Sequence, residues 1–210
     1  MGVDKVILRA FLNTLAAIGI LILFLFTALC TFYPSTMMKL TYDLGMESAS
    51  IHFAERAYKV SDDIYYIAYA TEVAIGEGKD GKIDSCGERF IEDENFGAYC
   101  AAKNEEFAAM DGNAENGEAY EQYYEQYIYG QVCIAKYNCG DKQEAVDCAF
   151  AWNGTSFKKN NAVVAVLITV LQAGDVETAQ MIKGKMEQMQ ESVSEADRAY
   201  FERTLGLLGG

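Results

Sequence analysis

Proline and histidine are almost absent from this sequence of 210 residues, which contains only Pro34 and His52. The scarcity of proline removes the strongest breaker of helices. Alternating Val, Ile and Thr segments joined by turn dipeptides, which are typical of β-strands, are also missing. Ala, Glu, Gln, Met and Leu, which all favour helices, are common instead. The composition therefore predicts an all-α chain.

Positive charge is scarce as well. The sequence has 17 Lys and Arg against 31 Asp and Glu, and its formal net charge is −14. A chain this acidic repels phosphate backbones and anionic membrane surfaces, which excludes nucleic acid as a partner. The acidic surface itself favours solubility.

No arrangement of residues typical of an active site or a metal site is present. His52 is the only histidine, and it lies among alanines in a predicted helix, where a structural role is favoured. No two cysteines have C-x-x-C spacing, and no carboxylate is paired with a histidine. We therefore expect no catalytic residues, no metal site and no cofactor. An enzyme with an unrecognised site is the least favoured hypothesis.

Six cysteines occur, an arrangement that leaves two interpretations open. Five lie outside the longest apolar run, so they cannot all pair within one chain. A disulfide across one helical hairpin, Cys133–Cys148 or Cys139–Cys148, is one alternative. Small buried thiols are the favoured interpretation. The cysteines are Cys30, Cys86, Cys100, Cys133, Cys139 and Cys148.

One long apolar run lies near the N-terminus. No charged residue occurs from Ala10 to Met38, and about 20 apolar residues in a helix span a bilayer. The run is longer than the apolar region of a cleaved signal peptide. Residues 10–33 are therefore predicted to cross a membrane once, within an anchor segment 1–34. Pro34 is expected to end the span or to open the next helix.

The charges that flank this run indicate its orientation. Lys5 and Arg9 precede it, and the positive-inside tendency places the N-terminus in the cytoplasm and the rest of the chain outside. A second apolar run, Ala162 to Leu171, is only half a membrane span and is predicted to be a buried core helix.

Glycine-centred segments recur at a regular spacing. The segment Gly140 to Ala145 resembles the segment that begins at Gly174. The interval between these two glycines, like that between Gly45 and Gly78, is close to the period of about 34 residues that is typical of paired helices joined by a tight turn. Glycine permits a positive φ in such a turn, a following Asp caps the second helix, and small residues let the helices approach closely.

On these motifs the chain resembles the tetratricopeptide-repeat (TPR) family over roughly residues 35–190. The match is incomplete, because the interval from Gly78 to Gly140 is shorter than two such periods and the first helix of each pair departs from the family pattern. The resemblance implies that residues 35–210 form an acidic, TPR-like α-solenoid of antiparallel helical hairpins. Membrane-anchored members of this family act as scaffolds or assembly helpers.

The predicted helices cover residues 5–33, 35–44, 46–60, 63–76, 81–92, 94–110, 116–138, 142–153, 160–173, 176–191 and 195–208.

Tyrosines supply the candidate binding residues. Four of them, at positions 120, 123, 124 and 127, share one helical face. In the resembled family the corresponding face lines a peptide-binding groove, and tyrosine suits recognition because it combines apolar area with a hydroxyl. Packing in the core is the alternative interpretation. The predicted partner-binding residues are Tyr65, Tyr69, Tyr123, Tyr127 and Tyr137.

These observations together predict a membrane-tethered scaffold that binds another protein through a helical-repeat groove. The acidic surface favours a basic protein or peptide as partner. The alternative is a structural component of a membrane assembly that associates with itself.

Overall fold

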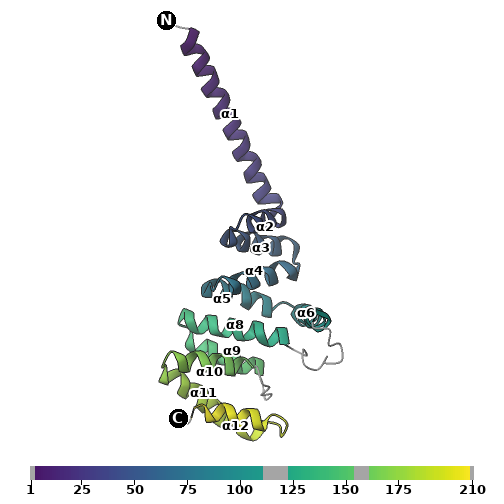
Figure 1. Ribbon diagram of the computed structural model, residues 1–210, viewed down its shortest axis with the longest axis vertical. Helices are drawn as coiled ribbons and strands as arrows, with labels where there is room; N and C mark the ends of the chain where they lie inside the picture. The colour runs from purple at the N-terminus through teal and green to yellow at the C-terminus, as the bar shows by residue number, and fades with distance from the viewer. Residues whose placement is uncertain (1–2, 111–122, 154–160, 209–210) are drawn as a thin grey trace. The chain divides into compact units, whose positions relative to one another are not determined.

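A computed structural model describes residues 3–110, 123–153 and 161–208 (Figure 1). These residues form helices and the turns between them, with no strand in the described ranges. The predicted all-α class is confirmed for this part of the chain. The chain divides into two compact units, residues 1–70 and 71–210.

The helices begin and end close to the predicted positions. The predicted helix starts at residues 116 and 160 lie outside the described residues, and every other boundary differs by no more than three residues. The first unit contains α1 (Val3–Phe32), α2 (Pro34–Asp43), α3 (Glu47–Ser61) and the beginning of α4 (Ile64–Gly76). The second unit contains the end of α4, α5 (Asp80–Ile91), α6 (Phe96–Met110), α8 (Tyr123–Cys139), α9 (Lys142–Asn153), α10 (Ala162–Gln172), α11 (Val176–Met189), a 3-10 turn (Gln190–Ser192) and α12 (Arg198–Gly206).

Helix α1 accounts for the N-terminal apolar run. Its segment Ile7–Phe32 is long and apolar enough to cross a membrane, by length and composition. Its large apolar side chains are exposed, as expected for a helix with no protein core to enter. Pro34 occupies the first turn of α2, where its missing N–H removes no helical hydrogen bond. The helix break at Pro34 thus agrees with the prediction.

Four turns of the same type close α2, α4, α8 and α10. In each, a glycine with positive φ donates its N–H to the carbonyl three residues earlier, and the following N–H donates to the carbonyl five residues earlier. All eight N···O distances lie between 2.8 and 3.1 Å. This is the Schellman motif, which satisfies the last carbonyls of a helix and favours a residue without a Cβ. The glycines are Gly45, Gly78, Gly140 and Gly174, and their predicted place at turns is confirmed.

Aspartate side chains accept backbone N–H groups at the starts of two helices. The Asp175 carboxylate accepts the Thr178 N–H at 3.2 Å and caps α11. The Asp63 carboxylate accepts the Tyr65 N–H at 3.0 Å at the start of α4. The side chains at the starts of α3 and α5, Met46 and Lys79, make no such bond. Aspartate capping is therefore a feature of some of these helices, as their sequences indicate.

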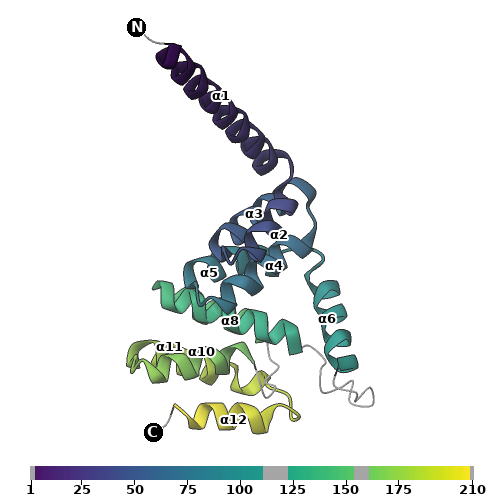
Figure 2. The same cartoon turned by 45° about the horizontal axis from the view of Figure 1, so that its top comes forward.

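Helix α8 lies at the centre of the second unit, with α5 against one side and α10 against the other (Figure 2). Helix α9 packs against α8 on the same side as α10 (Figure 1). The contact with α5 is unusually close, since a Cβ at Gly87 would stand 2.3 Å from Cγ2 of Val132. On the other side, one apolar cluster runs from α8 to α12. It includes Val163, Val166, Leu167 and Val170 of α10. The prediction that the second apolar run is core is therefore confirmed for one face of α10, whereas Ile168 and Leu171 are exposed.

Candidate functional site

The tyrosines at the start of α8 divide between the core and the surface. Tyr123 and Tyr127 are 47% and 44% exposed, whereas Tyr124 is only 4% exposed. The Tyr124 hydroxyl donates a hydrogen bond to the Glu72 carboxylate, and its ring packs against Tyr99 and Phe107. Burial, followed by this hydrogen bond, raises the pKa of Tyr124 well above its usual range. Tyr120 lies outside the described residues.

Tyr123 and Tyr127 border a hollow of about 270 Å³ between α8 and α10. Both helices are the first of a hairpin, α8 before the Gly140 turn and α10 before the Gly174 turn. A Cβ at Gly130 would stand 3.4 Å from the Ala165 Cβ, so the two helices approach closely here. The hollow is lined by Tyr123, Gln126, Tyr127, Gly130, Gln131, Asn161, Val164, Ala165 and Ile168.

Among the described residues, the lining of this hollow carries no Asp, Glu, Lys or Arg side chain. Apolar surface comes from Val164 and Ile168, and neutral hydrogen-bonding groups come from glutamine, asparagine and tyrosine side chains. Partial burial raises the pKa of Tyr127, and the charges of Tyr123 and Glu72 add to that shift. Tyr127 therefore remains a neutral hydroxyl at physiological pH. Apolar side chains and neutral hydrogen-bonding groups therefore make up the described lining of the hollow.

Tyr137 occupies a different environment from the other predicted binding residues. It is 9% exposed, and its hydroxyl donates to Asp175 Oδ2 at 3.1 Å. Lys142 Nζ lies 2.7 Å from the same oxygen, and the Thr178 hydroxyl donates to it at 2.8 Å. The ammonium of Lys142, and then the Thr178 hydrogen bonds, hold the pKa of Asp175 well below its usual range. Tyr137 thus joins two successive hairpins through the aspartate that caps α11.

Tyr65 and Tyr69 belong to the first unit. Their rings lie with centroids 6.4 Å apart, and Tyr69 also meets Tyr42 edge-on at 5.8 Å. Tyr65 is exposed, while burial raises the pKa of Tyr69. The hollow described above is built from the second unit alone, so these two tyrosines form a separate aromatic group.

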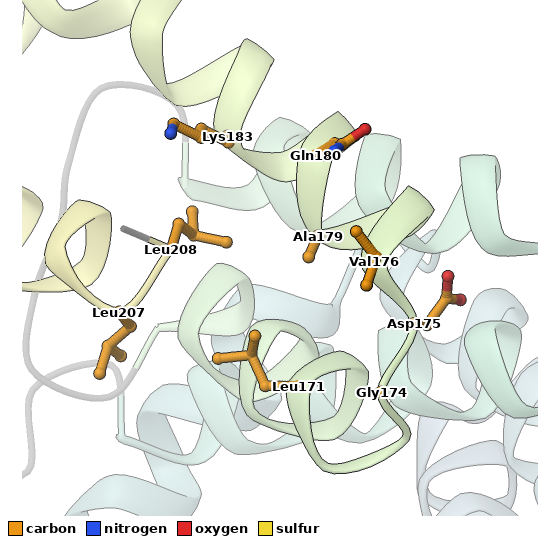
Figure 3. A pocket seen from close by; sticks show the side chains of 9 residues that line it. All are labelled: Leu171, Gly174, Asp175, Val176, Ala179, Gln180, Lys183, Leu207 and Leu208. Carbon is orange, nitrogen blue, oxygen red and sulfur yellow. The ribbon is translucent and has the colours of Figure 1, made fainter. Parts of the chain in front are cut away.

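A second hollow, of about 330 Å³, lies between α10, α11 and the end of α12 (Figure 3). Leu171, Ala179 and Leu208 give it an apolar interior, and Gln180 and Lys183 stand on α11 at its edge. Val176 and Leu207 also line it, and both are exposed. Exposed aliphatic side chains around an apolar hollow indicate a surface that a further helix or chain could cover.

No family model, curated protein or solved structure matches this chain.

The spacing of the tyrosines indicates the two exposed ones that border the first hollow, but no predicted site residue lies on its other wall. Val164 and Ile168 belong to the apolar run that was predicted to be core, and their neighbours Val163, Val166 and Leu167 are indeed buried. The signal that could have separated them is the helical period, which places residues 164 and 168 on one face. In residues 3–110, 123–153 and 161–208, no group of three or more His, Cys, Asp or Glu side chains could hold a metal ion.

Proposed function

We propose that this chain is a membrane-tethered, TPR-like helical-repeat protein that binds a peptide segment of another protein in the hollow between α8 and α10. Four equivalent glycine turns support the repeat architecture. Two pairs of these glycines, Gly45 with Gly78 and Gly140 with Gly174, are separated by close to the TPR period of about 34 residues.

The observation that carries the proposed site is the exposure of two tyrosines over a hollow formed by the first helices of successive hairpins. First helices line the groove in the resembled family. Tyrosines exposed beside a concave surface are typical anchors for a bound segment, because they bury large area at low rotamer cost. Exposed Ile168 on the facing helix supplies a matching apolar contact.

The proposed partner is a basic peptide segment. The Glu72 carboxylate accepts a hydrogen bond from Tyr124, which lies between the two exposed tyrosines in the sequence of α8, and the whole chain carries a net charge of −14. The negative electrostatic field of the chain would raise the association rate of a basic segment and would favour it over neutral or acidic segments.

The proposed tether is α1, with the N-terminus in the cytoplasm and the second unit outside. Its apolar segment Ile7–Phe32 has the length and composition of a span, and Lys5 and Arg9 precede most of it. Anchoring raises the effective concentration of the binding domain near partners in the same membrane.

Replacing both exposed tyrosines by alanine is expected to weaken peptide binding at least tenfold, or about 1.4 kcal/mol, because two aromatic anchors are lost. The probe is a displayed library of random peptides, panned against the full chain in detergent micelles. Affinities of the enriched peptides are then measured for wild type and for the Tyr123→Ala/Tyr127→Ala variant.

The matched control is Tyr200→Ala, because Tyr200 is 41% exposed but belongs to α12, away from the lining residues. This variant should bind the same peptides as wild type does. Enriched peptides should be rich in Lys and Arg. A library that yields no binders, or binders unaffected by the double substitution, contradicts the proposed site.

Self-association is a second candidate function, and the hollow beside α12 favours it. Exposed Val176 and Leu207 border that hollow and would be covered by a second copy. We expect Leu207→Lys to convert an oligomer of the full chain in detergent to a monomer, as measured by sedimentation. Wild-type particles that hold one chain at every concentration contradict this candidate.

A further inference from the structure

Two cysteines face each other inside the α8–α9 hairpin. The Cys133 thiol donates a hydrogen bond to Cys148 Sγ, with the two sulfur atoms 3.2 Å apart. Cys133 is fully buried and Cys148 is partly exposed. A disulfide needs a separation of about 2.05 Å between its sulfur atoms, so an approach of roughly 1 Å would join this pair.

The hairpin geometry explains why these two cysteines meet. They stand at nearly equal distances before and after the turn glycine Gly140, and equidistant positions in antiparallel helices lie opposite each other. Cys139 lies at the end of α8, beside the turn. Cys148 is nine residues further along the chain, mostly within α9, and a helix rises about 1.5 Å per residue. The geometry therefore favours Cys133 over Cys139 as the partner of Cys148.

We infer that Cys133 and Cys148 form a site of thiol–disulfide exchange, at which a small-molecule disulfide converts the pair to an intrachain disulfide that joins α8 to α9. Because α8 also lines the hollow between α8 and α10, this bond would fix the hairpin behind the proposed binding surface. The inference is independent of what that surface binds.

The electrostatics of the pair indicate which of the two sulfurs ionises more readily. The hydrogen bond from Cys133, and to a smaller extent the ammonium of Lys136, lower the pKa of Cys148. The same hydrogen bond and burial raise the pKa of Cys133. Lys136 is itself held by Asp84 and Glu88 at 2.9 and 3.0 Å. Cys148 is thus both the more accessible sulfur and the more readily ionised one.

The proposed exchange takes place in two steps. The Cys148 thiolate attacks one sulfur of the external disulfide, forms a mixed disulfide and releases one external thiolate. Cys133 then gives its proton to that thiolate or to solvent. Its thiolate sulfur attacks Cys148 Sγ and expels the second external thiolate, which takes up the proton that Cys148 had released to solvent. The protein loses two electrons and two protons, and the external disulfide becomes two thiols.

The test uses the full chain in detergent, incubated with oxidised glutathione, then alkylated and digested with trypsin. Lys136 and Lys142 lie between the two cysteines, so a Cys133–Cys148 bridge yields two linked peptides that reduction separates. We expect this linked pair to dominate, and the intact mass to fall by two hydrogen atoms. The midpoint of thermal unfolding should rise by roughly 5–10 °C and fall back when dithiothreitol is added.

Cys139→Ala is the matched control, because it removes the third cysteine of the same hairpin and should leave the linked pair unchanged. Cys148→Ala should abolish it. Because Cys148 is only partly buried, this variant perturbs the core less than a change at Cys133. Recovery of both cysteines as free alkylated thiols, or of Cys139 in the linked peptide, overturns the inference.

Discussion

Replacing Gly87 by leucine is expected to lower the free energy of unfolding by about 3 kcal/mol, the upper end of the usual cost of overfilling a packed core. A Cβ at this position would stand 2.3 Å from Val132 Cγ2, 3.5 Å from Val132 Cβ and 3.6 Å from Thr71 Cγ2. The first distance is too short for any real contact, so α5 and α8 would have to separate. Urea unfolding of the full chain in detergent, followed by circular dichroism, measures the loss.

The control is Gly184→Leu, in the interior of α11, where an added Cβ would meet nothing within 4 Å. Helix propensity alone predicts that both substitutions stabilise the chain, by up to about 0.8 kcal/mol. If the free energy of unfolding falls for the Gly87 variant and rises for the Gly184 variant, the tertiary contact at Gly87 is the cause. Equal effects at both glycines would show that α5 and α8 do not pack as described.

A pair of single changes isolates the contact further. Gly87→Ala and Val132→Ala are each expected to destabilise the chain, by overpacking and by a cavity respectively. The double variant should lose roughly 1 kcal/mol less free energy of unfolding than the two single variants lose together. The reason is that alanine at position 132 lacks the methyl group that collides with a Cβ at position 87. Strict additivity would contradict this explanation.

Two arginines in the middle of α1, Ile20→Arg and Leu23→Arg, are expected to abolish membrane insertion. Each charged side chain at the centre of a bilayer costs about 2.5–3.5 kcal/mol, so together they remove roughly 6 kcal/mol from the free energy of insertion. Alkaline extraction of membranes from expressing cells measures the result: wild type should remain with the lipid, and the double variant should be released.

The matched control is Leu40→Arg with Leu44→Arg. Leu44 and Leu23 are both 65% exposed, but Leu40 and Leu44 follow Pro34 and lie beyond the apolar segment Ile7–Phe32. If α1 is the anchor, this pair should leave the chain in the membrane. If the arginines at 20 and 23 also leave it there, α1 is not what holds the chain.

Much of the fold could be predicted from the sequence because its causes are local. A glycine that must adopt positive φ, followed closely by residues that can start a helix, marks a turn whatever surrounds it, and this holds at Gly45, Gly78, Gly140 and Gly174. Pro34 separates two helices for an equally local reason. The start of the last helix was less well placed. Ser194 and Asp197 do bond to each other, but only a turn forms there before α12 begins at Arg198.

The candidate site could be predicted only in part. Spacing placed Tyr123, Tyr124 and Tyr127 on one side of a helix, and it could not say which of them would face solvent. The Glu72 carboxylate and the rings of α6 draw Tyr124 inward, whereas Tyr123 and Tyr127 stay open beside α10. Tyr137 is turned into the core by Asp175, which belongs to the next hairpin along the chain.

The helices, the turns and the apolar N-terminal segment can be read from the amino-acid sequence, because backbone preference, capping and hydrophobic length depend on neighbouring residues. The packing of the helices sets which tyrosines remain exposed, why position 87 has no room for a side chain, and which cysteine faces Cys148. Those outcomes depend on contacts between residues that are far apart in the chain, and no local pattern specifies such contacts.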